Sequence, residues 1–152
     1  MSIRRRMTAA LMLAGAALVA CADGGQDGTD REEAVAEIMP QGPLLDSAMA
    51  AHLPPGATFE QAQAGHRLFT VCTVCHGPAA EGTQLGPSFV DGEWIAVEPD
   101  VGQIAEIIRT GVPRPAEYPV PMPPHGGGDF DDDELRALAV YILTVANGGV
   151  AQ

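Results

Sequence analysis

The sequence contains no lysine, so each of its basic side chains is an arginine. Lys and Arg together number 8 against 20 Asp and Glu, which gives a formal net charge of −12 at pH 7. The phosphates of nucleic acids and of anionic lipids repel so acidic a chain, and we expect no nucleic-acid partner. With 152 residues, the chain has room for one domain and little more.

The apolar stretch near the N-terminus, residues 8–20, is too short to cross a bilayer. It follows three arginines at residues 4–6, as in a signal peptide, and the arginines also fit a twin-arginine signal. The stretch ends in Leu-Val-Ala-Cys, which resembles the lipobox of bacterial lipoproteins and implies cleavage before Cys21 and its acylation. An ordinary signal peptide with an incidental cysteine is the alternative. We expect residues 1–20 to be a signal peptide and the mature chain to be lipid-anchored on the periplasmic side of a bacterial cell envelope.

The segment after Cys21 lacks the composition of a packed core. Residues 22–33 are polar, acidic and rich in glycine. Prolines and glycines between residues 40 and 56 interrupt any regular element. We therefore expect residues 21–57 to form a flexible, lipid-anchored tether and residues 58–152 to form the folded domain.

The alternating pattern of a strand is absent over any useful length, whereas three segments have helical spacing. Thr58 and Gln61 form a capping box before the first segment. Asp100 caps the second, which Gly111 ends, and acidic residues 131–134 occupy the first turn of the third, where the helix dipole favours anions. An all-α domain with three main helices is predicted. Its expected buried positions are Ala62, Gly65, Phe69, Ile104, Ile107, Ile108, Leu135, Leu138, Ile142 and Val145.

The chain has only three cysteines, too few for a disulfide framework. Cys72 and Cys75 are followed directly by His76, in the pattern Cys-x-x-Cys-His that attaches a c-type haem. Each thiol would form a thioether with the porphyrin, and the imidazole would ligate the iron. A thioredoxin-like redox pair would require a βαβ setting, and a zinc site would require more cysteines or histidines at ligand spacing. Neither is visible.

The combined pattern over residues 58–147 resembles a class I cytochrome c. Gly65, Phe69 and Tyr141 stand where that fold crosses its terminal helices. The resemblance implies a class I cytochrome c fold, with three main helices around one covalently attached haem c and its iron. It also implies that the Pro87 carbonyl accepts a hydrogen bond from the haem-ligating histidine.

The second axial ligand of the iron has two candidates after the haem motif, Met122 and His125. The prolines around Met122 stiffen its loop, which lets a weak thioether donor stay on the iron. In the family, a Met-Pro segment supplies this ligand, so we expect His76 and Met122 as the axial pair and His125 as a loop residue. His/Met ligation leaves no open position for a substrate.

Trp94 is the only tryptophan, and two roles are open for it. It packs against the haem as a wall, or it donates its indole N–H to a haem propionate with Arg109 or Arg114 as charge partner. In either role it is a predicted haem-binding residue.

These features predict a non-enzymatic one-electron carrier, a periplasm-facing, membrane-anchored monohaem cytochrome c in a respiratory or dehydrogenase-linked chain. Its expected partners are redox proteins such as a dehydrogenase or a terminal oxidase. One alternative is a haem enzyme or sensor, peroxidase-like or gas-binding, with an open sixth coordination site. Another is a haem subunit fixed within a dehydrogenase or oxidase complex.

Overall fold

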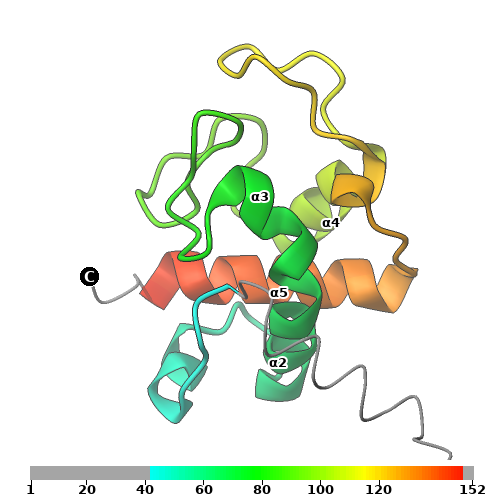
Figure 1. Cartoon of the computed structure of the whole chain (residues 1–152). Coiled ribbons are helices and arrows are strands. Elements are labelled where there is room, and N and C mark those ends of the chain that lie inside the picture. The colour runs from blue at the N-terminus through cyan, green and yellow to red at the C-terminus, as the bar shows by residue number, and fades with distance from the viewer. Residues whose placement is uncertain (1–41, 149–152) are drawn as a thin grey trace, which may run out of the picture.

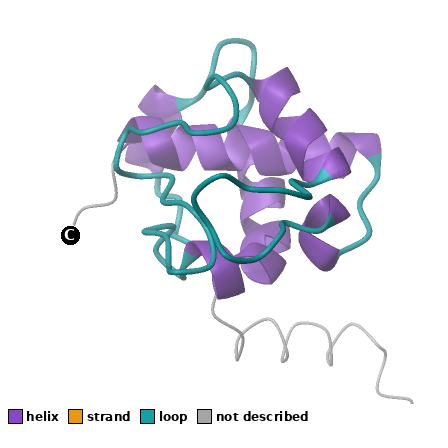
Figure 2. Ribbon diagram, turned by 90° about the horizontal axis from the view of Figure 1, so that it is seen from above, coloured by secondary structure: helices purple, strands orange, loops and turns teal. Residues whose placement is uncertain are grey.

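The computed structural model describes residues 42–148, and every regular element among them is a helix (Figures 1 and 2). Residues 1–41, which include the expected signal peptide, Cys21 and the first part of the expected tether, lie outside the described residues. None of the described helices is long and apolar enough to cross a membrane. The elements in chain order are η1 (Ser47–His52), α2 (Phe59–Leu68), η2 (Phe69–Cys72), α3 (Thr73–His76), α4 (Val101–Thr110), η3 (Pro124–Gly127) and α5 (Asp132–Gly148).

The three longer helices begin where the sequence predicts. The Thr58 hydroxyl accepts the Gln61 N–H at 3.2 Å, and the Gln61 side chain accepts the Thr58 N–H at 2.9 Å. Asp131 and Glu134 form the same reciprocal pair at the start of α5, with both distances 2.9 Å. The Asp100 carboxylate caps α4. The prediction of an all-α domain with three main helices is confirmed, and the haem motif adds the short helix α3.

Helix α5 is the centre of the fold. Its residues 137–145 are all buried, and α2, α4 and η1 pack against it. In Figure 1, α5 runs across the molecule while α3 and α4 lie above it and η1 lies below it. A helix buried on all sides must be apolar on all sides, and the run Ala-Leu-Ala-Val-Tyr-Ile-Leu-Thr-Val meets this requirement.

The backbones of α2 and α5 come into contact at Gly65. A Cβ atom at this position would overlap the carbonyl oxygen of Ala137 and come within 2.7 Å of Tyr141 Cβ. One turn farther along, Phe69 packs edge-on against the Tyr141 ring, with the ring centroids 5.1 Å apart. The crossing expected from Gly65, Phe69 and Tyr141 is therefore present.

The prediction of a flexible tether is wrong for its last part, residues 42–57, which we call the strap. The strap packs against the domain, because the Tyr141 hydroxyl donates to the Pro43 carbonyl at 2.8 Å and His66 Nε2 lies 3.0 Å from the Gly42 carbonyl oxygen. The packed domain thus begins earlier than the sequence predicts. Local composition does not reveal this, because Pro43 and Tyr141 are 98 residues apart in the chain.

The crossing of α2 and α5 yields a stability prediction. Gly65→Val should lower the free energy of unfolding by about 2–3 kcal/mol, because its side chain forces the two backbones apart. Guanidinium titration of the holoprotein measures this change. Gln63→Ala, at an exposed position of the same helix, is the control and should change stability by less than about 0.5 kcal/mol. Equal stabilities for Gly65→Val and the control would contradict the close contact.

Candidate functional site

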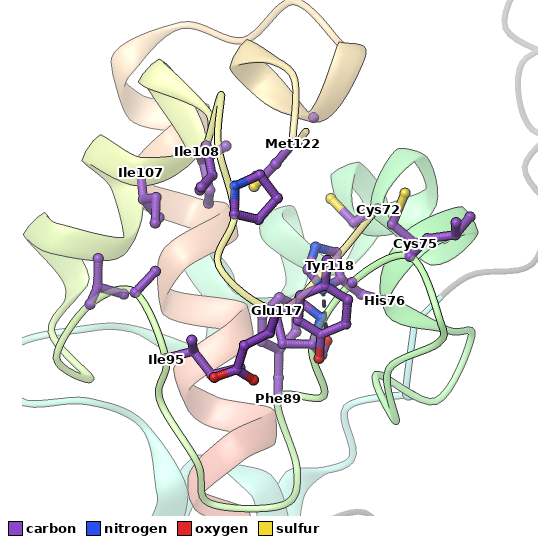
Figure 3. A pocket seen from close by; sticks show the side chains of 18 of the residues that line it. Cys72, Cys75, His76, Phe89, Ile95, Ile107, Ile108, Glu117, Tyr118 and Met122 are labelled. Carbon is purple, nitrogen blue, oxygen red and sulfur yellow. Dashed lines mark hydrogen bonds between the residues drawn. The ribbon is translucent and has the colours of Figure 1, made fainter. Parts of the chain in front are cut away.

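An apolar cavity of about 350 Å³ lies between α3, α4 and the loops that follow them (Figure 3). Its volume is in the range of pockets that hold small organic ligands or cofactors. Three charged side chains, Glu93, Arg114 and Glu117, also line it, and all three are solvent-exposed. The apolar part of the lining includes Leu85, Phe89, Trp94, Ile95, Val97, Ile104, Ile107, Ile108, Val112, Val120 and Ile142.

Both thiols of the Cys-x-x-Cys-His motif lie in the cavity wall. Cys72 ends η2 and Cys75 lies in α3, so about one helical turn brings the two side chains to the same wall. Neither forms a disulfide. Burial, and to a smaller extent the neighbouring Cys75, raises the pKa of Cys72 to about 12. A thioredoxin-like redox pair needs a βαβ setting, and the regular elements of residues 42–148 are all helices, so this alternative does not fit the site.

His76 is buried beside the thiols, and its ring is fixed by a backbone contact. Its Nδ1 lies 2.8 Å from the Pro87 carbonyl oxygen. Because the carbonyl only accepts, Nδ1 carries the proton and Nε2 keeps its lone pair. Burial lowers the pKa of His76, and the hydrogen bond to Pro87 opposes this shift only in part. The neutral imidazole is the form that binds a metal ion, and the contact with Pro87 is the one that the resemblance implied.

A second contact on the His76 ring comes from a residue that the sequence did not single out. The Phe89 ring stacks on the imidazole, with a centroid distance of 4.3 Å and an interplanar angle of 22°. Tyr118 also lines the cavity and was also missed. The only sequence signal for Phe89 is an aromatic residue two positions after Pro87. Two contacts, one polar and one aromatic, therefore fix the plane of the imidazole.

Met122 reaches the same cavity from a different segment, the loop between α4 and η3 (Figure 3). Its backbone pairs with Val112 in an isolated antiparallel bridge, with N–H···O distances of 2.9 and 3.0 Å. Gly111, which has a φ of 68°, directly precedes Val112 and lies against Met122, because a Cβ atom on Gly111 would overlap the Met122 carbonyl oxygen. The thioether is thus held by the backbone as well as by the flanking prolines.

His125, the other candidate ligand, is placed differently. It is not among the residues that line the cavity. Its Nδ1 accepts the backbone N–H of Phe130 at 3.0 Å. The structure therefore brings Met122, and not His125, to the cavity that contains His76.

The structure also separates the residues proposed to contact haem propionates. Trp94 is half-buried and lines the cavity, as does Arg114. Arg109 is not among the lining residues, and its guanidinium pairs with Glu106 at 2.5 Å and Asp132 at 2.7 Å. Of the two arginines considered, only Arg114 lies at the cavity.

The residues of this site fit a covalently attached haem. An apolar cavity excludes water, two thiols lie in its wall, and an imidazole with a free Nε2 and a thioether line it from separate segments. The site fits a zinc ion less well than a haem. Residues 42–148 contain no group of three or more His, Cys, Asp or Glu side chains that could hold a metal ion.

Comparison with known proteins gives one family. The model of the family described as "Cytochrome C oxidase, cbb3-type, subunit III" matches residues 60–142, more than half of the chain. No match was found among curated proteins or solved structures. The matched range includes the haem motif, the cavity-lining loops and Met122. The chain therefore belongs to this family of class I monohaem c-type cytochromes, and its domain is an electron-transfer domain with a covalently bound haem c and its iron.

Proposed function

We propose that this protein carries single electrons at the periplasmic face of a bacterial membrane, within a respiratory or dehydrogenase-linked chain. The observation that carries the proposal is the position of His76 and Met122, which line one apolar cavity from two separate segments. In the proposal, Cys72 and Cys75 would form the thioether bonds, and His76 and Met122 would both bind the iron. Such a pair leaves no coordination position for oxygen or peroxide.

Haem iron supplies the one-electron chemistry when it is bound. The chain contributes the ligands and their orientation. The Pro87 carbonyl and the Phe89 ring hold the His76 imidazole in one plane, and the bridge to Val112 holds Met122. These contacts leave the two side chains little freedom to move when the charge on the site changes. The apolar lining keeps water from competing for the ligand positions.

Trp94 and Arg114 complete the proposed haem site. Both line the cavity, and Trp94 packs against the Phe89 ring with a centroid distance of 6.4 Å. Packing of the indole against the porphyrin and donation of its N–H to a propionate are both compatible with this position. Arg114 is then the cation for a propionate, since Arg109 is engaged by two carboxylates elsewhere.

The proposed partner is a redox protein of the same membrane, either a dehydrogenase or a terminal oxidase. The description of the matched family names an oxidase subunit, which favours the oxidase. Five exposed apolar side chains form what we call the apolar collar, and all but Val74 line the cavity. Val74 lies between the two cysteines and is 71% exposed. The collar consists of Val71, Val74, Leu85, Ile95 and Val120.

The ligand assignment is tested by replacing the thioether. In the oxidised holoprotein, Met122→Ala should abolish the weak long-wavelength sulfur-to-iron absorption band and lower the reduction potential, because a thioether favours ferrous iron. It should also open the iron to carbon monoxide. Met49→Ala is the control, because Met49 lies in η1 and not at the cavity. If the unmutated ferrous protein binds carbon monoxide rapidly at neutral pH, the electron-carrier proposal is wrong and the haem enzyme or sensor alternative takes its place.

The docking surface is tested by electron-transfer kinetics with a partner. Val74→Ser combined with Ile95→Ser should reduce the bimolecular rate about fivefold, through the loss of about 1 kcal/mol of apolar contact. Leu44→Ser is the control, since Leu44 is 82% exposed but belongs to the strap.

With a basic partner, the rate of electron transfer should also fall as the salt concentration rises, because screening removes the steering by the acidic chain. A rate independent of salt would favour docking through apolar contacts alone or a subunit fixed within a complex.

The membrane anchor is tested at Cys21, which lies outside the described residues. The full-length protein should partition with membranes, and Cys21→Ser should release it or block its processing. Two or three acyl chains anchor a protein stably, whereas one binds only marginally. Mass spectrometry of the mature N-terminus measures the modification, and an unmodified N-terminus would refute the anchor while leaving the haem site untouched.

A further inference from the structure

The turn that joins Met122 to α5 has an unusual backbone. Three consecutive residues have positive φ angles, namely His125 (57°), Gly126 (61°) and Gly127 (91°). Glycine adopts this region freely, but a residue with a Cβ atom is disfavoured there. In the described part of the chain, Ala80 is the only other residue besides glycine with a positive φ. A histidine in a strained position between a proline and two glycines calls for a physical reason.

The side chain of His125 supplies that reason. Its Nδ1 accepts the backbone N–H of Phe130 at 3.0 Å, and its ring is nearly parallel to the Phe130 ring, with an interplanar angle of 12° and a centroid distance of 6.1 Å. Because this N–H donates, Nδ1 is unprotonated. The contact joins the turn to the residue that precedes the capping box of α5.

Two backbone hydrogen bonds complete the closed turn. The Gly126 N–H donates to the Pro123 carbonyl and the Gly128 N–H donates to the His125 carbonyl, both at 3.0 Å. Gly126 also lines the cavity, where a Cβ atom would lie 3.9 Å from Cys72 Sγ. The turn therefore touches the wall that carries the thiols, and it begins directly after Met122-Pro123.

We propose that His125 is a positioning residue for the Met122 ligand. It ties the C-terminal side of the Met122 segment to the N-terminus of α5 through Phe130, while the bridge to Val112 holds the backbone of Met122 itself. Met122 is then fixed both at its own backbone and by the turn that follows it, and His125 acts through the backbone without touching the iron. The inference rests on the proposed function, in which Met122 is the axial ligand.

Three variants of the holoprotein separate the side chain from the backbone. His125→Asn keeps an acceptor on a short side chain and tolerates positive φ. His125→Gly removes the strain and the acceptor together, and His125→Leu keeps the bulk but removes the acceptor. The readouts are the sulfur-to-iron band of the ferric protein, the rate of carbon monoxide binding to the ferrous protein, and hydrogen exchange of the Phe130 amide.

The expected result is that His125→Gly and His125→Leu weaken the band and speed carbon monoxide binding about fivefold, the effect of losing one hydrogen bond. Exchange of the Phe130 amide should accelerate in both, and His125→Asn should restore all three readouts toward the parent. Circular dichroism identifies any variant that fails to fold, and His125→Gly, which removes strain, tests the proposal even if His125→Leu is unstable.

Two outcomes separate the failure of this inference from the failure of the proposed function. If the parent protein has no sulfur-to-iron band, Met122 is not the ligand, and both the positioning role of His125 and the proposed function fail. A parent with the band, and a His125→Gly variant with the same band and the same carbon monoxide rate, shows that the turn needs only its glycines. In that case His125 has no positioning role, and the electron-carrier proposal stands.

Discussion

The contact between α2 and α5 at Gly65 is the constraint on which the other parts of the structure depend. It places the end of α2 over Tyr141, so that Phe69 is buried against the Tyr141 ring. Phe69 begins η2, and η2 leads directly into α3, which carries the motif. The direction of the thiols and the imidazole is therefore set by a helix crossing that requires a residue without a side chain. The strap adds to the same core, because its Pro43 carbonyl accepts the Tyr141 hydroxyl.

The cavity combines a mostly apolar lining with a thiol and an imidazole that are buried and carry no charge. Burial favours the neutral forms of Cys72 and His76. The charged side chains of the lining are all exposed, and the ion pairs of Arg109 lie elsewhere. The charge of the lining is therefore carried by exposed side chains, while the buried Cys72 thiol and His76 imidazole are neutral.

The sequence was informative wherever the physical cause is local. The capping box at Thr58 and the cap at Asp100 each depend on residues three positions apart, and the motif at Cys72 is contiguous. Contacts between distant segments were harder to predict. For the strap the sequence predicts a tether, because the composition is poor in regular structure, whereas the contacts that hold the strap lie on α2 and α5. The stacking of Phe89 on His76 was missed for a similar reason, since it depends on how the loop after α3 folds back.

A thioether is a weak ligand, so in the proposed site the polypeptide must keep Met122 in place rather than rely on the iron to do so. The backbone on one side of Met122 is paired with Val112 over Gly111, where there is no room for a Cβ atom. On the other side, prolines limit the backbone and the turn at His125 closes onto Phe130. These constraints are backbone contacts and proline rings, so the cavity needs no polar side chain to orient the sulfur. In the proposed carrier, this loop would therefore keep the second ligand position of the iron closed, although it is remote in the chain from the haem motif.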